Sequence, residues 1–144
     1  MKNSPLHTLL VDVLARYESI VFALLFGSQC SGNLRFDSDI DIALYFEDLP
    51  DLLALGEIIA QLENATKQKI DLIVLNDLHA KNPLLAYNIT GKHAVLINHD
   101  RDRYEAFKHR SYIDYFDFKP IIVAQNQKLI EELNHGNFGK AKRA

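Results

Sequence analysis

Residues 27–41 read GSQCSGNLRFDSDID, and this stretch decides both the fold and the chemistry that we expect of the chain. It follows an apolar run from Ile20 to Phe26, rich in β-branched and aromatic residues, which predicts a buried central strand. Gly27 ends the strand, because glycine lets the backbone turn and approach an anion closely. Ser28 then offers a hydroxyl and backbone amides that suit a phosphate group, although ordinary turn chemistry explains a Gly-Ser pair as well.

Strict alternation begins at the end of this stretch and predicts a strand over residues 39–46. One face carries Asp39, Asp41, Ala43 and Tyr45, and the other carries Ile40, Ile42, Leu44 and Phe46. Residues two apart in a strand lie about 6.5 Å from each other on one face, so this carboxylate pair can bracket metal ions about 4 Å apart. Hard oxygen ligands favour Mg²⁺ over zinc. The alternative is that both carboxylates are solvated on an exposed face.

A third carboxylate, Asp71, lies among apolar residues in a predicted strand over residues 69–75. A buried aspartate without a partner costs free energy, so we expect this side chain to face a positive charge. A metal ion shared with the first two carboxylates would supply that charge. The alternatives are an ion pair with Lys67 or Lys69, or a strand end that reaches solvent.

Hydrophobic periodicity predicts the remaining elements. They are helices over 5–18, about 52–62 and about 84–89, a strand over 94–97, and helical structure from 100 onward, with a break at Pro120 before a last helix to about 134. Strands separated by helices and short connections indicate one layered α/β or α+β domain. We expect that domain over 1–135, with a core over 5–100, C-terminal helices over 101–135 and a flexible tail over 136–144.

Composition narrows the functional classes. The chain has 144 residues, with 16 basic and 19 acidic side chains and a net charge of −3, so a long nucleic-acid substrate is disfavoured. The longest apolar stretch, 20–26, is far shorter than the roughly 20 residues of a membrane helix, and we expect neither a secretory leader nor a membrane partner. A single cysteine, Cys30, excludes an internal disulfide and a thiolate zinc cluster, which fits the cytoplasm.

A Gly-Ser turn, an Asp-x-Asp pair on the next strand and a third acid further on together resemble the polymerase β nucleotidyltransferase superfamily. Ten residues separate Ser28 from Asp39, and this spacing and the small size are similar to the minimal nucleotidyltransferases, in particular the MntA-type antitoxins. The resemblance covers about residues 5–100. It implies a mixed four-stranded sheet flanked by helices, with a helical C-terminal extension.

The resemblance also implies a role for each motif residue. Gly27 and Ser28 would hold the β- and γ-phosphates of ATP. Asp39 and Asp41 would bind two Mg²⁺ ions, and Asp71 would hold the catalytic metal and help to deprotonate the attacking hydroxyl. In-line attack on the α-phosphate would then transfer a nucleotidyl group and release pyrophosphate.

One departure from the family pattern concerns charge. Many relatives carry arginines directly after Gly-Ser, whereas this chain has Gln29, Cys30 and Ser31. Arg35 is a candidate replacement, or else a solvated loop residue.

The resemblance implies a protein acceptor. In the MntA-type family, AMP is added to a tyrosine of a HEPN-fold ribonuclease toxin, HepT, with which the antitoxin forms a hetero-oligomer. Two alternatives stay open: a binding-only antitoxin that acts by occlusion, and a small-molecule adenylyltransferase of the aminoglycoside type.

Overall fold

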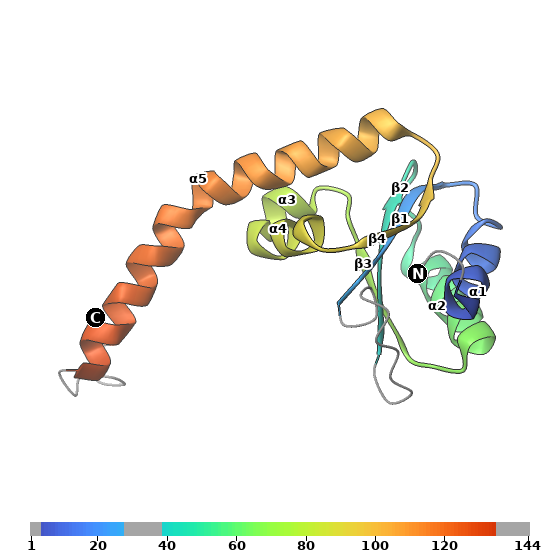
Figure 1. Cartoon of the computed structure of the whole chain (residues 1–144), viewed down its shortest axis with the longest axis horizontal. Coiled ribbons are helices and arrows are strands. Elements are labelled where there is room, and N and C mark those ends of the chain that lie inside the picture. Colours follow the sequence, from blue (N-terminus) through green and yellow to red (C-terminus); the bar gives the residue numbers. More distant parts are fainter. Residues whose placement is uncertain (1–3, 28–38, 135–144) are drawn as a thin grey trace.

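The computed structural model describes residues 4–27 and 39–134, with side chains described to residue 118. A four-stranded sheet carries helices on both faces, and a long C-terminal helix leaves the sheet (Figure 1). In chain order the elements are α1 (Pro5–Leu14), β1 (Ile20–Phe26), β2 (Ile40–Phe46), α2 (Leu52–Thr66), β3 (Ile70–Val74), α3 (Leu78–Lys81), α4 (Pro83–Gly91), β4 (Ala94–Asn98) and α5 (Arg101–Asn134).

The sheet has the strand order β3-β2-β1-β4. β1 is antiparallel to both β2 and β4, whereas β2 and β3 are parallel. The C-terminal end of β1 and the N-terminal ends of the other three strands therefore lie at the same end of the sheet. β1 lies between two partners, and six of its seven residues are buried. The predicted central strand and the predicted mixed four-stranded sheet are both confirmed.

The alternation of β2 separates two apolar layers. Ile40, Ile42, Leu44 and Phe46 pack with α1 and α2, as residues such as Leu14 and Leu62 show. On the opposite face, Ala43 and Tyr45 pack with α4 and α5. Because successive side chains of a strand point to opposite faces, Asp41 belongs to the α4–α5 face. The candidate site therefore lies on the face of the sheet that carries α4 and α5.

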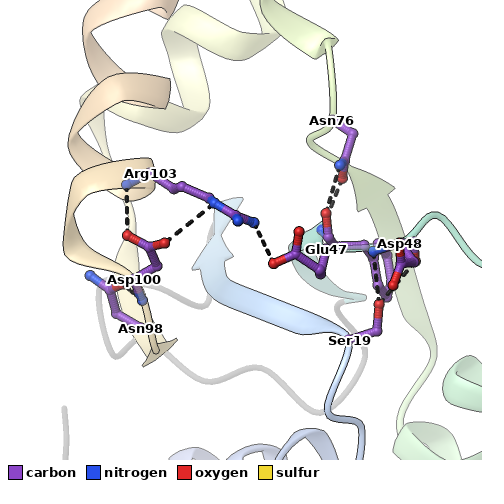
Figure 2. Close-up of polar contacts among 8 residues, drawn as sticks. Ser19, Glu47, Asp48, Asn76, Asn98, Asp100 and Arg103 are labelled. Carbon is purple, nitrogen blue, oxygen red and sulfur yellow. Dashed lines mark hydrogen bonds and ion pairs between the residues drawn. The ribbon is translucent and has the colours of Figure 1, made fainter.

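Hydrogen bonds and ion pairs join neighbouring segments at the end of the sheet that lies away from the carboxylates (Figure 2). The side-chain amide of Asn76 donates to the Phe46 carbonyl at 2.8 Å and accepts from the Phe46 N–H at 2.9 Å. Arg103, in the first turn of α5, pairs with Glu47 at 2.8 Å and with Asp100 at 3.3 Å. The Arg103 pairs join the first turn of α5 to Glu47, the residue directly after β2.

Three predicted elements differ from the structure. α1 ends at Leu14 rather than 18, because the N–H groups of Arg16 and Tyr17 bond three residues back and tighten the chain into turns. The short helix α3 had no predicted counterpart. The predicted break at Pro120 is wrong, since α5 is assigned as one helix from Arg101 to Asn134. A proline removes one helical hydrogen bond and bends a helix without having to end it, and Figure 1 shows α5 bending.

The predicted tail over 136–144 lies outside the described residues. Within the part that the structure describes, none of the helices combines the length and the apolar character needed to cross a membrane.

Candidate active site

The turn at the end of β1 depends on glycine for two reasons. Gly27 has a φ of 74°, in the left-handed region that hinders residues with a Cβ. A Cβ at this position would also overlap the carboxylate of Asp41. The predicted glycine turn and the predicted carboxylate are therefore in direct contact, which their separation of fourteen residues in the sequence does not reveal.

Asp41 and Asp71 occupy matching positions on neighbouring strands. They are register partners in the parallel pair β2–β3, so their side chains point to the same face of the sheet. Partial burial, then the charge of Asp71, the charge of Asp39 and a hydrogen bond to the Asp71 carboxyl raise the pKa of Asp41 above its ordinary value. The structure thus brings two of the three predicted carboxylates into contact.

Asp39 contributes charge to this group from just outside the strand. β2 begins at Ile40, one residue later than predicted, and Asp39 directly precedes it. Its negative charge is one of the causes that raise the pKa of Asp41, after burial and the charge of Asp71. Among the residues that the structure describes, histidine, cysteine, aspartate and glutamate side chains form no group of three close enough to surround a metal ion. Asp39 therefore adds negative charge next to the Asp41–Asp71 pair.

The surroundings of Asp71 differ from those expected. β3 is an edge strand, and Asp71 is exposed at its second residue, so the expectation that burial forces this carboxylate to find a positive partner is wrong. Asp71 instead lies near the beginning of β3 and reaches solvent, as the second alternative for this residue stated. Neither Lys67 nor Lys69 forms an ion pair with it in the described part of the chain.

The donor set nevertheless fits a hard divalent cation. Asp41 and Asp71 present carboxylate oxygens that are held together against their mutual repulsion, and a cation between them would replace repulsion by attraction. Both side chains reach solvent to some degree, which leaves room for the water ligands that Mg²⁺ retains. Ser28 and Arg35, the other two predicted site residues, lie outside the described residues.

A pocket beside the turn was not found by sequence reasoning. It encloses about 350 Å³ between the end of β1 and α4, and its lining comprises Phe26, Gly27, Leu85, Asn88, Ile89 and Lys92. The residues from α4 carry no recognisable motif, because their proximity to Gly27 arises only when α4 packs on the sheet.

Comparison with curated proteins identifies two relatives. The chain is 41% identical over 54 residues to a candidate protein adenylyltransferase of Methanocaldococcus jannaschii, and 37% identical over 54 residues to the protein adenylyltransferase MntA of Thermococcus cleftensis. Each alignment covers 38% of this chain, and it spans 63% of the first relative and 54% of the second. The chain therefore matches less than two thirds of the length of either relative.

Solved structures share the fold over most of the chain. A toxin-antitoxin complex with AMP-PNP contains a chain of 23% identity and a TM-score of 0.67, with 88% of this chain and 97% of that chain covered. A complex of an MNT antitoxin with a tri-AMPylated HEPN toxin of Shewanella oneidensis matches at 20% identity and a TM-score of 0.59, covering 88% and 98%. At such identities the likeness establishes the fold alone.

The family is established by a sequence model instead. The model described as "Polymerase beta, Nucleotidyltransferase" matches residues 9–102, which run from within α1 through the whole sheet to the first residues of α5. That span holds the glycine turn and all three carboxylates. With most of its length matched and the expected fold in place, the chain belongs to the polymerase β nucleotidyltransferase family.

Proposed function

We propose that this chain is a Mg²⁺-dependent protein adenylyltransferase that transfers AMP from ATP to a tyrosine of a HEPN-family toxin, and that it acts as the antitoxin of that protein. The observation that carries the proposal is the contact of Asp41 and Asp71 on one face of the sheet, at the end where the chain turns at Gly27. Relatives named as protein adenylyltransferases, and structural neighbours in complexes with HEPN toxins, support it.

In the proposed reaction the acidic side chains bind metal ions and accept a proton. Asp39, Asp41 and Asp71 would hold two Mg²⁺ ions, and the ions would supply positive charge for an in-line displacement at phosphorus. Asp71 accepts the proton of the tyrosine hydroxyl as that oxygen attacks the α-phosphate of ATP. The bond from the α-phosphorus to the bridging oxygen breaks, and pyrophosphate leaves. Gly27 and Ser28 position the terminal phosphates, because a turn without a Cβ lets the backbone approach them.

A protein acceptor agrees with the net charge of the chain. Its net charge of −3 gives no basic field for a nucleic-acid substrate, so a protein acceptor fits better. We place the reaction in the cytoplasm, where ATP and a ribonuclease toxin would meet.

Intact-mass spectrometry of the acceptor tests the proposal. A HEPN-family toxin incubated with this chain, ATP and Mg²⁺ should gain the mass of one or more AMP units, and peptide mapping should locate them on tyrosine. EDTA should prevent the gain. Tight complex formation with an unmodified toxin would support an antitoxin that acts by occlusion. An adenylyl adduct on an aminoglycoside, with the toxin unmodified, would support a small-molecule enzyme.

A further inference from the structure

The most exposed large apolar side chains that the structure describes lie together at the start of α2. Leu49, Leu52 and Leu53 are 62%, 86% and 85% exposed. Single exposed leucines are ordinary on a protein surface, whereas several side by side in the chain mark a contact with another protein. We call these three residues the leucine patch.

A pocket of about 460 Å³ lies beside the leucine patch. Its inner surface includes Phe46 and Ile58, which are almost fully buried, and Tyr17, which is partly buried. Leu53 precedes another lining residue, Glu57, by one helical turn, so these two side chains lie on the same side of α2. The surface therefore combines an apolar projection with an apolar recess next to it.

Hydrogen bonds order the segment that carries the leucine patch. The Ser19 hydroxyl donates to the Asp48 carbonyl at 2.9 Å and accepts from the Asp48 N–H at 3.1 Å (Figure 2). Asp51 caps α2 by accepting from the N–H of Ala54 at 2.8 Å. A backbone that is already ordered loses less entropy on association. The surface is therefore formed before a partner arrives.

Two opposite charges lie at the same pocket. Arg16 and Glu57 both line it and are both exposed, and neither forms an ion pair within the described part of the chain. Burial and then the charge of Glu57 raise the pKa of Tyr17, whereas the charge of Arg16 lowers it. Both charges therefore lie near this one side chain, and each is available to a charge of opposite sign on a partner.

We propose that this surface binds a second copy of the chain through a two-fold contact, in which the leucine patch of each copy enters the pocket of the other and Arg16 of each copy pairs with Glu57 of the other. A two-fold contact requires a self-complementary surface. This surface meets the requirement, because it carries the projection, the recess and both signs of charge. A different partner would not need the two halves of the contact to lie on one surface.

The contact leaves the candidate active site open. Phe46 ends β2 and packs on the α1–α2 face, whereas Asp41 lies near the other end of the same strand and on the opposite face. Each copy in the dimer therefore keeps its carboxylates accessible. The inference does not depend on the proposed function.

Sedimentation equilibrium of the full chain across a concentration series tests the contact. The wild type should shift from monomer to dimer as concentration rises. Leu53→Glu should weaken self-association about tenfold or more, because it places a charge in an apolar recess. Leu84→Glu is the matched control, since Leu84 is an exposed leucine on α4, which packs on the opposite face of the sheet. This control should dimerise as the wild type does.

Reversing the charges tests the two-fold geometry. Arg16→Glu alone and Glu57→Arg alone each bring like charges together at both pairs, so each should weaken self-association about tenfold. An equimolar mixture of the two variants should form a mixed dimer, because both pairs then join opposite charges again. Native mass spectrometry identifies the mixed dimer by a mass between those of the two homodimers.

Three results would overturn the inference. The first is a wild-type chain that stays monomeric at every concentration, even if Leu53→Glu lowers its affinity for a toxin, since the leucine patch would then belong to the toxin contact. The second is a Leu53→Glu variant that dimerises as well as the Leu84→Glu control. The third is a mixture of the two charge variants that forms no mixed dimer.

Discussion

Asp41 and Asp71 are register partners on two parallel strands, and the charge of Asp71 helps to raise the pKa of the Asp41 carboxyl. Two like charges on one sheet face destabilise the folded chain unless a cation lies between them. The fold thus retains an arrangement that costs stability in the metal-free protein, as is common where a site is built for a ligand.

Asp41→Asn should raise the Tm of the metal-free protein at neutral pH. The folded-state pKa of Asp41 is raised, so this carboxyl favours folding below its ordinary value of 3.8, and that contribution is lost as the pH rises through the folded-state pKa. The difference in Tm between variant and wild type should therefore be small near pH 3.5 and grow towards pH 7. Thermal unfolding across this range measures it, and an Asp41→Asn protein that is less stable than wild type at pH 7 would contradict the relationship.

Millimolar Mg²⁺ should raise the Tm of the wild-type chain, because a ligand that binds only the folded state stabilises it. Asp41→Asn should show a much smaller rise, since it loses one of the two charges in contact. NaCl at the same ionic strength is the control, as it screens the repulsion without binding between the carboxylates. Equal shifts with both salts would mean that the carboxylates attract no specific cation.

Asp39→Ala or Asp41→Ala should abolish transfer of AMP to the toxin and leave the fold nearly intact. Removing one of several repelling carboxylates rarely destabilises a protein by more than about 0.5 kcal/mol. Mass spectrometry of the acceptor measures transfer, and circular dichroism with thermal unfolding measures the fold. Transfer retained in either variant would falsify the assignment of these side chains to the metal ions.

Asp71→Asn should reduce turnover more than nucleotide binding. In the proposed reaction this carboxylate receives the proton of the attacking hydroxyl, which matters in the transition state and not in the ground state. Single-turnover rates and the affinity for AMP-PNP, measured on the same protein, separate the two quantities. A loss confined to binding would argue against a role for Asp71 near the attacking oxygen.

Gly27→Ala should destabilise the fold by about 1–3 kcal/mol and reduce transfer. The φ of 74° at this position is unfavourable for a residue with a Cβ, and the new Cβ would overlap the Asp41 carboxylate. Gly56→Ala provides the matched control. Gly56 lies inside α2 with open space where its Cβ would be, so the same substitution there should stabilise by about 0.5–1 kcal/mol. Denaturant unfolding of both variants measures the contrast, which would disappear if the turn tolerated a side chain.

Much of the fold could be predicted because the relevant signals are local. The apolar run from Ile20 to Phe26 and the alternation after Asp39 correspond to β1 and β2 within one residue. Pro120 shows the limit of such a signal, since α5 continues through this proline to Asn134. The exposure of Asp71 could not be predicted, because its sequence neighbours are apolar whether a strand is central or at an edge.

The sequence by itself determined that a strand ends at a glycine, that Asp41 lies in the next strand with Asp39 two residues before it, and that a third aspartate lies in a later strand. These properties follow from steric limits at Gly27 and from the two-residue period of β-strands. Only the tertiary structure decided that Asp71 lies beside Asp41, and that Lys92 shares a pocket with Gly27. Strand register and helix packing join residues that are distant along the chain, and no local pattern of side chains specifies which of them will meet.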